Sequence, residues 1–266
     1  MHRSAPTVGT LIRDWRQRRR MSQLDLACEA EISARHLSFL ETGRSTPSRD
    51  MVLRLADRLD TPLRARNLML LAAGFAPTFP ERALGDPGLG AARAALEQLL
   101  KAHEPFPALV VDRRWNLVAA NAAIAPLVSS AAPALLQPPV NVLRLGLHPD
   151  GIAPRIDNLA QWRAHLLHRL RRQVEETADE DLAALLAELS AYPAPPDTNE
   201  SVPDDQIAVP LRLKSDRGLL SFWSATMMFG GPLDVTLSEL MLETFLPADA
   251  QTGARMAELL AEATRS

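Results

Sequence analysis

Hydrophobic positions over the first 75 residues recur at helical spacing, in five short runs that polar turn signals separate. Ser22 and Ser33 each stand directly before one of these runs, where a serine side chain can cap a helix N-terminus. Only residues 29–32 separate the two helices that these caps begin, so the helices must meet at a sharp angle. The pattern therefore predicts an all-α, five-helix domain over residues 1–75.

The helical pattern ends at Gly74, after a fifth helix in which we expect Leu68 and Leu71 to face inward. Gly74 is the first of four glycines that, with three prolines, interrupt every periodicity in the stretch that follows. We therefore predict a linker over residues 76–90 and a second domain over residues 91–266.

The second domain mixes helical and strand patterns. An amphipathic helix with Leu99 facing inward opens it, and short apolar runs that flank turn residues predict two β-hairpins. We expect helices over 91–102, 121–128, 161–176, 179–191 and 248–263, strands over 108–111, 115–119, 207–214, 219–228 and 240–246, and a long loop over 192–205. This order predicts an α+β domain with a small antiparallel sheet, so the chain as a whole is expected to be α+β.

Charge divides the chain in the same place. Residues 1–75 hold 13 arginines and no lysine against eight acidic residues, a balance of +5, whereas residues 76–266 carry −8. The basic part should attract phosphate and the acidic part should avoid it. Four arginines crowd the end of the first helix, where they can favour either DNA or the negative end of the helix dipole. They are Arg16, Arg18, Arg19 and Arg20.

The two capped helices and the turn after them carry a specific set of residues: Gln23, Leu26, Ala27, Ile32, Ser33, Leu37, Leu40, Glu41, Gly43, Arg44, Pro47 and Ser48. This set resembles the helix-turn-helix of Cro and the phage repressors, also called the xenobiotic-response-element family. The turn between the helices usually carries glycine in that family, and this chain has Glu31. A left-handed backbone there would cost a non-glycine residue on the order of 1 kcal/mol.

The resemblance implies double-stranded DNA as a partner and a recognition helix over residues 33–42. Arg35 suits a bidentate contact to guanine, and Phe39 suits a thymine methyl group or, as an alternative, core packing. Gln23 and Arg44 are expected to hold phosphates. The DNA-contacting residues we predict are Gln23, Ser33, Ala34, Arg35, His36, Ser38, Phe39 and Arg44.

Four stretches of the second domain, 115–121, 141–159, 211–240 and 243–249, carry distinctive phrases such as WNLVAAN at the start of the first. The most specific phrase lies at 229–240, where Phe-Gly precedes PLDVTLSEL. These stretches resemble the ligand-binding domain of the MmyB-like transcription regulators. The resemblance implies a fold related to PAS sensors and a fatty-acid-like or other small hydrophobic effector.

Large apolar side chains around the predicted sheet are numerous enough to line a ligand cavity as well as a core. Two adjacent methionines give an adaptable lining, and Arg144 or Arg155 can pair with a carboxylate or instead brace a loop. The ligand-contacting candidates are Trp115, Asn121, Arg144, His148, Arg155, Phe222, Trp223, Met227, Met228 and Phe229.

Catalytic and metal-binding motifs are missing from the sequence, including the nucleophile elbow, the phosphate-binding glycine loop and H-E-x-x-H. His165 and His168 stand three apart on one predicted helix, but they lie among arginines, which favours a solvated face over a zinc site. His148 is expected to be a loop residue or a ligand contact and not a haem ligand. We therefore expect no catalytic activity, no cofactor and no metal.

The only cysteine, Cys28, excludes an intrachain disulfide; the N-terminal residues show no signal-peptide core, and no apolar run is long enough to span a membrane. We expect a cytoplasmic homodimer, not bound to a membrane, that regulates transcription by binding DNA under the control of the effector. Two alternatives are a haem- or flavin-binding PAS-type sensor and a ligand-free protein-interaction module, each attached to the same DNA-binding domain.

Overall fold

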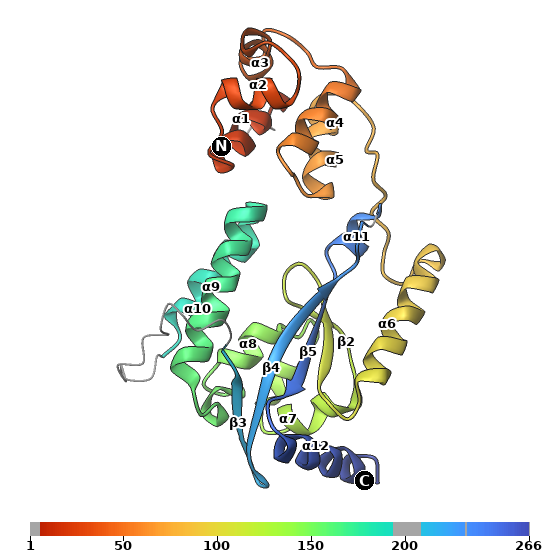
Figure 1. Cartoon of the computed structure of the whole chain (residues 1–266), viewed down its shortest axis with the longest axis vertical. Coiled ribbons are helices and arrows are strands. Elements are labelled where there is room, and N and C mark those ends of the chain that lie inside the picture. Colours follow the sequence, from red (N-terminus) through yellow and green to blue (C-terminus); the bar gives the residue numbers. More distant parts are fainter. Residues whose placement is uncertain (1–5, 194–208, 232, 266) are drawn as a thin grey trace. The chain divides into compact units, whose positions relative to one another are not determined.

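The computed structural model describes residues 6–193, 209–231 and 233–265, so most of the predicted loop over 192–205 lies outside the described residues. The chain divides into two compact units (Figure 1). Unit 1 comprises Met1–Arg82 with the short segments Glu175–Thr177 and Gly231–Ser238, and unit 2 comprises Ala83–Val174, Ala178–Gly230 and Glu239–Ser266.

Unit 1 is built on the five helices that the sequence predicts. They are α1 (Val8–Arg18), α2 (Gln23–Glu29), α3 (Ala34–Glu41), α4 (Arg49–Arg58) and α5 (Leu63–Ala72). Ser22, Ser33 and Ser48 cap α2, α3 and α4, because each hydroxyl accepts a hydrogen bond from the backbone N–H three residues further on. Gly43 follows α3 with a φ of 72°, a left-handed conformation that suits glycine at a helix end.

The helices of unit 1 enclose one apolar core, in which Ile12, Leu26 and Leu37 are fully buried. The backbones of α1 and α3 come very close at Gly9. A Cβ atom at this position would lie only 2.3 Å from the carbonyl oxygen of Leu40, so this crossing requires glycine.

The fifth helix buries a different face from the one expected. Leu68 and Leu71 are each 54% exposed, whereas Met69 and Leu70 are fully buried and Asn67 is buried beside them. The expectation was wrong because residues 68–73 are all apolar, so the hydrophobic pattern does not select one side of the helix.

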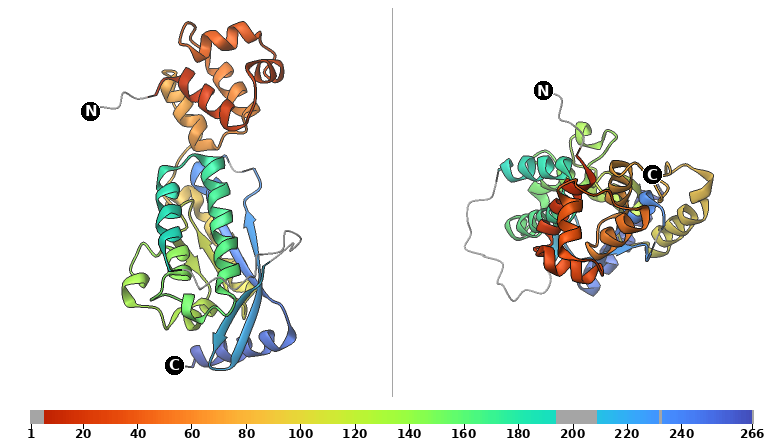
Figure 2. Two further views of the ribbon diagram at one scale, coloured as in Figure 1. Left: turned by 90° about the vertical axis from the view of Figure 1, so that its left-hand side faces the viewer. Right: turned by 90° about the horizontal axis from the view of Figure 1, so that it is seen from above.

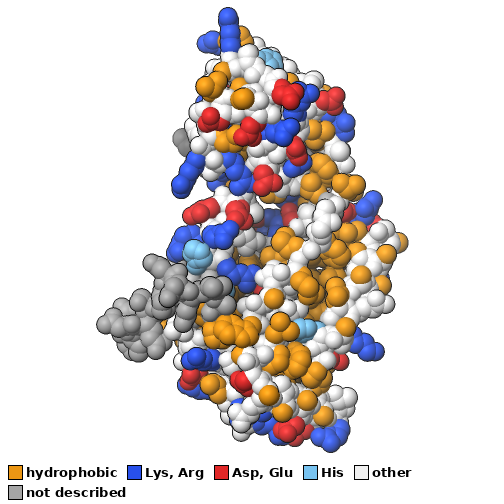
Figure 3. All heavy atoms as spheres, in the orientation of Figure 1, with side chains coloured by type: hydrophobic (Ala, Val, Ile, Leu, Met, Phe, Trp, Pro, Cys, Tyr) orange, Lys and Arg blue, Asp and Glu red, His pale blue; other side chains and the backbone are white. Residues whose placement is uncertain are grey.

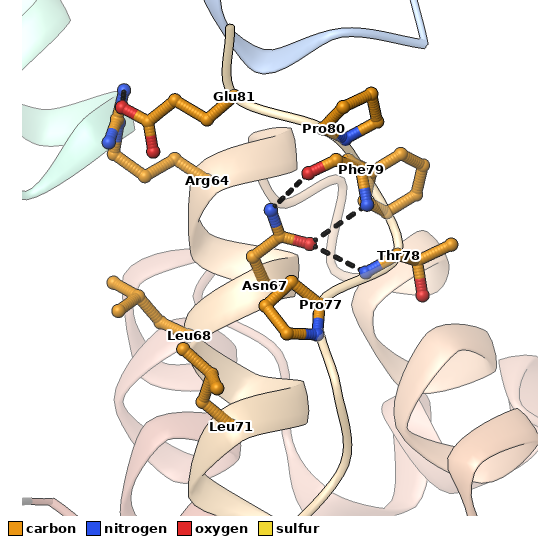
Figure 4. Close-up of a pocket in the computed structure, with 9 residues that line it drawn as sticks. All are labelled: Arg64, Asn67, Leu68, Leu71, Pro77, Thr78, Phe79, Pro80 and Glu81. Carbon is orange, nitrogen blue, oxygen red and sulfur yellow. Dashed lines mark hydrogen bonds and ion pairs between the residues drawn. The ribbon is translucent and has the colours of Figure 1, made fainter.

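Asn67 is buried because its amide holds the residues that follow the helix (Figure 4). The Nδ2 atom of Asn67 donates to the carbonyl oxygen of Phe79 at 2.7 Å. Its Oδ1 atom accepts from the backbone N–H groups of Thr78 and Phe79, both at 3.1 Å. The beginning of the predicted linker is therefore attached to α5 by three hydrogen bonds.

The segment Gly231–Ser238, which includes the short helix α11 (Val235–Ser238), also belongs to unit 1. The backbone N–H of Val235 donates to the carbonyl oxygen of Pro80 at 2.8 Å. The buried carboxylate of Asp234 pairs with Arg82 at 3.2 Å. Residues 80–82 and 234–235, which are far apart in the sequence, are thus bound to each other within unit 1.

Unit 2 contains a five-stranded sheet with helices, which confirms the α+β prediction. The remaining elements are the short 3₁₀ turns η1 (Pro87–Leu89), η2 (Ala122–Ile124), η3 (Pro133–Leu136) and η4 (Ala153–Arg155), the helices α6 (Gly90–His103), α7 (Ala125–Val128), α8 (Val142–Leu147), α9 (Leu159–Thr177), α10 (Glu180–Ala191) and α12 (Ala250–Ala263), and the strands β1 (Ala108–Val111), β2 (Leu117–Ala120), β3 (Leu211–Ser215), β4 (Gly218–Met228) and β5 (Met241–Pro247).

The strands follow the order β2-β1-β5-β4-β3, and every neighbouring pair is antiparallel. The two predicted hairpins, β1–β2 and β3–β4, form the two sides of the sheet. The last strand, β5, enters between them and pairs Leu242 with Val110 and Phe245 with Ser224. β5 thus joins the two hairpins into one sheet, and its pairs with β1 link residues more than one hundred positions apart.

Several helices pack against the sheet. Trp162, Leu166 and Leu170 of α9 share one core with sheet residues that include Val111 and Phe222. Figures 1 and 2 show α9 and α10 together on this side of the sheet. Helix α6 packs against β1, and α12 packs against β4 and β5.

Two local expectations for unit 2 were wrong. Leu99 on α6 is exposed, because Leu96 and Leu100 form the buried stripe of this helix. Trp115 does not begin a strand: it has a φ of 65° in the turn before β2, which starts at Leu117.

One length of β4 is apolar and open to solvent. β3 pairs with β4 only over Gly218–Phe222, and among the described residues no strand pairs with that edge of β4 beyond Phe222. Three residues of β4, spaced four apart and so on one face of the strand, are each between 41% and 45% exposed, Leu246 of β5 is 46% exposed, and Figure 3 shows hydrophobic side chains gathered over these strands. We call this set the β4 apolar face; it consists of Leu219, Trp223, Met227 and Leu246.

Helices of membrane-spanning length and hydropathy do not occur within the described part of the chain.

Candidate functional site

Helix α3 and its flanks carry the residues that the sequence assigned to DNA contact. Arg35 and Arg44 are exposed, and Ala34, His36, Ser38 and Phe39 are partly exposed. Leu37 and Leu40 fill the opposite, buried face of the helix. The hydroxyl of Ser33 accepts from the backbone N–H of His36 at 3.1 Å, so this side chain already serves the cap.

Phe39 holds two guanidinium groups beside its ring. The Cζ atom of Arg35 lies 5.4 Å from the ring centroid of Phe39, and the Cζ atom of Arg44 lies 6.0 Å from it. Phe39 is half-buried, so it contributes to packing while its remaining surface orients both arginines. The arrangement places two positive charges next to each other on the exposed side of α3.

Gln23 is held differently from the phosphate contact expected of it. Its Nε2 atom donates to Oε2 of Glu41 at 2.8 Å. Glu41 is only 3% exposed and also accepts from Arg16, whose Nε and Nη2 atoms lie 2.7 Å and 3.0 Å from the two carboxylate oxygens. Gln23 and Arg16 therefore form a buried polar cluster with Glu41.

The charge state of Glu41 follows from this cluster. Burial alone would raise the pKa of the Glu41 carboxyl group, but hydrogen bonds from Arg16 and Gln23, with the positive charges of Arg16 and Arg13, outweigh burial and lower that pKa below its ordinary value. Glu41 is thus ionised at neutral pH and joins α1, α2 and α3.

Arginines at the end of α1 are likewise divided between roles. Arg19 donates to the carbonyl oxygens of Leu59 and Asp60, at 2.9 Å and 2.6 Å, and Arg16 binds Glu41. Arg18 and Arg20 are exposed. Two of the four arginines in this group therefore stabilise unit 1.

Glu31 has a φ of 55°, so the turn between α2 and α3 uses the left-handed conformation that glycine usually provides. The backbone N–H of Ile32 donates to the carbonyl oxygen of Ala27 at 2.9 Å and closes this turn. The backbone of this turn thus has the conformation that glycine usually provides, although glutamate adopts it less readily.

Unit 2 contains an apolar cavity of about 120 Å³ between the sheet and its helices. Sheet residues such as Leu109, Phe222 and Phe245 line one side of it, and helix residues such as Leu143, Trp162 and Leu166 line the other. An engineered cavity of about 150 Å³ holds benzene, so this volume suits a small apolar group or one end of a chain.

The cavity lining includes two charged residues, Arg169 and Glu243, which belong to a polar cluster. The Nη2 and Nη1 atoms of Arg169 lie 2.8 Å and 3.2 Å from Oε1 and Oε2 of Glu243. The hydroxyl of Thr226 donates to Oε1 of Glu243 at 2.8 Å and accepts from Nη2 of Arg169 at 2.9 Å. The Trp115 ring lies under Arg169, with 4.9 Å between its centroid and Cζ.

Of the ten residues that the sequence assigned to ligand contact, the structure brings Trp115 and Phe222 to this cavity. Asn121 is buried away from it, where its amide binds the backbone of Ala108, Leu100 and Phe106. That amide braces the start of β1 and does not face a ligand.

The polar candidates Arg144, His148 and Arg155 also lie outside the cavity lining. Arg144 forms a bidentate pair with Glu188 at 2.8 Å and 2.7 Å. Arg155 donates to the carbonyl oxygens of Leu127 and Lys214, so it braces a loop, one of its two expected roles. His148 Nδ1 accepts from the backbone N–H of Asp150 at 3.0 Å.

The four remaining candidates do not line the cavity either. Trp223 and Met227 point away from it, because neighbouring residues of a strand face opposite sides and Phe222 faces inward. Met228 is 62% exposed at the end of β4, and Phe229 follows the strand. The two methionines therefore do not form the adaptable lining that their adjacency suggested.

Arg169 and Glu243 were missed by the sequence reasoning, which placed Arg169 on a solvated helix face. One signal was present: Glu243 interrupts an apolar strand with a charge, and a charge in a central strand requires a partner. The face of α9 that carries the two histidines is only partly exposed to solvent. His168 is exposed, whereas His165 stacks on Trp162 with 5.4 Å between ring centroids.

Metal-binding clusters of three or more histidine, cysteine or carboxylate side chains do not occur among the residues that the structure describes.

Comparison with protein families matches residues 7–69 to a helix-turn-helix domain and residues 92–259 to the MmyB-like transcription regulator ligand binding domain. A comparison with curated proteins found no match. Both matched families are domains of regulators and not of enzymes. Since the second match spans more than half of the chain, the protein belongs to the MmyB-like transcription regulator family and is a DNA-binding transcription regulator with a ligand-binding domain.

Proposed function

We propose that the protein is a homodimer that binds a specific DNA sequence through α3 and binds a small hydrophobic effector, with an alkyl chain like that of a medium-chain fatty acid, in the cavity of unit 2. The observation that carries the ligand part is the apolar cavity of about 120 Å³, which lies within the residues that match the ligand-binding family. A medium-length chain requires the lining to move apart by a modest amount, since typical ligand sites span roughly 300–1,000 Å³. Haem and flavin would require a far larger change.

A cavity-filling variant tests this assignment. A Cβ atom added at Gly146, which lines the cavity on α8, would meet no atom within 4 Å, so Gly146→Leu is the substitution chosen to reduce the cavity volume. Gly90 at the start of α6 is open in the same way but lies outside the lining, and Gly90→Leu is the matched control.

We expect mass spectrometry of the denatured full chain to find a stoichiometric hydrophobic molecule in the wild type and in Gly90→Leu, and none in Gly146→Leu. 1-Octanol, which carries an alkyl chain of medium length, should raise the melting temperature of the first two proteins only when it is added to stripped protein. An empty wild type that no such molecule stabilises would support the interaction-module alternative and defeat the sensor proposal.

For DNA, we propose that Arg35 reads a guanine and that Arg44 holds a phosphate, each oriented by Phe39. The operator would be selected from a random DNA library and the affinities measured at several salt concentrations. Arg35→Ala should lose about 1–3 kcal/mol of preference at one base pair. Arg44→Ala should weaken all sequences alike and reduce the salt slope by about one.

The exposed Arg54 on α4 gives the matched control, and Arg54→Ala should change neither quantity beyond what one surface charge causes. If Arg35→Ala weakens operator and random DNA equally, the base contact is assigned to the wrong residue. We propose no direct DNA contact for Gln23, because its amide is bound to Glu41.

The dimer is proposed to form along the β4 apolar face and its open edge. The stretch from Gly218 to Leu233 contains no charged residue, whereas native edge strands usually carry charges that prevent pairing with another strand. Two copies of this edge can pair antiparallel across a two-fold axis, which is the common symmetry of soluble dimers.

Light scattering of the full chain measures its oligomeric state. Met227→Lys should give monomers, whereas Leu71→Lys, at a similarly exposed leucine of unit 1, should leave the dimer intact. The opposite result would move the interface to unit 1.

A further inference from the structure

Two charged side chains line the cavity of unit 2 among the residues that the structure describes, and they are Arg169 and Glu243. Most of the other lining residues are apolar, so this pair, with the neighbouring Ser224, is what the polar end of a bound amphiphile would meet. The charge of this pair therefore decides which head group the cavity accepts.

The two charges neutralise each other. Both nitrogens at the tip of Arg169 bind Glu243, at 2.8 Å and 3.2 Å, and Thr226 bridges the pair. The Glu243 side chain is 5% exposed, so it depends on Arg169 and not on water for its stabilisation. An effector carboxylate that displaced Glu243 would leave a buried, unpaired charge.

Among the described residues, no second cationic side chain lines the cavity to pair with an effector carboxylate. Arg144 is bound to Glu188, and Arg155 is bound to backbone carbonyl groups. Burial, followed by the positive charge of Arg169, lowers the pKa of His165 below its ordinary value, so this histidine is neutral at pH 7.

The pair can still form hydrogen bonds with a neutral group. Arg169 has five N–H donors and its bonds to Glu243 and Thr226 use three directions, while a carboxylate offers about four acceptor positions. A hydroxyl group can donate to Glu243 and accept from Arg169 in the same position.

On the basis of the proposed effector binding, we infer that the cavity selects an effector whose polar end is uncharged, such as an alcohol, an ester, a lactone or a protonated acid, and that Glu243 excludes an ionised carboxylate. Glu243 is thereby a specificity-determining residue. A second negative charge beside it in a place of low solvent exposure is disfavoured, whereas a neutral head group adds no charge.

Calorimetric titration of the full-length protein with 1-octanol and octanoate tests the inference, because the two probes share one chain length. An apolar cavity of any kind prefers the alcohol, so the decisive quantity is how the preference changes in Glu243→Gln. We expect this substitution to strengthen octanoate binding by about tenfold or more and to change octanol binding little. Glu188→Gln removes a carboxylate from the Arg144 pair outside the cavity and should change neither affinity.

A second measurement uses the wild type alone, in case Glu243→Gln does not fold. Octanoate should bind with uptake of about one proton, seen as a heat that varies with the ionisation enthalpy of the buffer, and its affinity should rise about tenfold for each unit by which the pH falls towards the pKa of the acid. Absence of octanoate binding beside clear octanol binding also supports the inference.

Octanoate that binds the wild type tightly without proton uptake would overturn the inference and leave the proposed effector cavity intact. An octanoate affinity that Glu243→Gln leaves unchanged would overturn it in the same way. If neither probe binds the wild type, the proposed function of the cavity fails, and this inference fails with it.

Discussion

Replacement of Glu41 by glutamine should destabilise the helix-turn-helix unit severely, although the side chain keeps its shape. The carboxylate accepts two hydrogen bonds from Arg16 and one from Gln23. Glutamine offers one oxygen in place of two and turns an amide N–H₂ group towards donors. Arg16 has a side chain only 11% exposed, so its charge would remain with no carboxylate beside it.

The cost can be set against the stability of the unit. Breaking a buried ion pair by removing one partner costs about 3–5 kcal/mol, and we expect the lower end because one hydrogen bond can persist. At roughly 0.05–0.15 kcal/mol per residue, a unit of about 75 residues has about 4–11 kcal/mol of stability. Glu41→Gln should therefore remove a large share of it.

Hydrogen exchange of the full chain measures this loss locally, in peptides from α1 to α5, without interference from unit 2. A loss of about 3 kcal/mol corresponds to exchange that is about 150-fold faster in these peptides. Glu29→Gln, on the exposed side of α2, is the matched control and should alter stability by less than about 0.5 kcal/mol. Exchange rates of the two variants that agree within about threefold would refute the role given to Glu41.

The dependence of stability on acidic pH should report on the same Glu41 carboxyl group. The pKa of Glu41 is lower in the folded unit than its ordinary value of about 4.3, so its contribution is complete above that value and is lost as the pH falls through the folded pKa. Wild-type unit 1 should thus lose protection below about pH 4, and Glu41→Gln should lack this part of the slope. If the protection of wild type and of Glu41→Gln falls equally with pH, other carboxylates cause the loss.

Three further substitutions test other parts of unit 1. Gly9→Ala should destabilise it by about 1–3 kcal/mol in thermal unfolding, despite the higher helix propensity of alanine, because the added methyl group meets the carbonyl oxygen of Leu40; an unchanged melting temperature would contradict the close approach. Glu31→Gly should stabilise the unit by up to about 1 kcal/mol in denaturant titration, since glycine adopts the positive φ without strain, whereas a loss would show that Glu31 makes a favourable interaction. Asn67→Ala should speed hydrogen exchange at residues 78 and 79 while α1 to α3 stay protected; unaltered exchange there would exclude the proposed attachment.

The helix-turn-helix unit could be predicted from the sequence because its signals are local. A serine before each of three helices and a glycine after α3 mark the helix ends within four residues of the groups they bind. The exception is α5, where consecutive apolar residues hid the buried face, which carries Asn67, Met69 and Leu70 in the structure. The polar cluster around Glu41 spans α1 to α3 and has no local signal.

In unit 2 most of the long helices and the strands were predicted, whereas α8 and the cavity were not. Strand and helix periodicities are properties of short segments, whereas the cavity depends on β5 entering the sheet between two hairpins. Arg169 and Glu243 are 74 residues apart and meet only in the folded sheet. The predicted relation of this domain to PAS sensors stays a prediction.

Strand alternation nevertheless contained information that residue type obscured. Phe222 faces the cavity, so Ser224 and Thr226 face the same side, and Trp223 and Met227 must face the other. Trp223 and Met227 were predicted as ligand contacts because of their side-chain chemistry, although the strand period of two places them on the outer face. The smaller hydroxyl residue Thr226 is the one that reaches the Arg169–Glu243 pair.

The same alternation gives a physical route from effector to DNA, if both proposals hold. β4 carries cavity residues on one face and the proposed dimer contacts on the other, so a guest that displaces Phe222 also moves Trp223 and Met227. A dimer reads two half-sites only when its recognition helices have the matching separation, so a shift at the dimer contact changes operator affinity. An effector should therefore alter operator binding in the wild type and leave it unaltered in Met227→Lys monomers, as measured by fluorescence anisotropy. An equal response in both proteins would mean that the signal reaches unit 1 without the dimer contact.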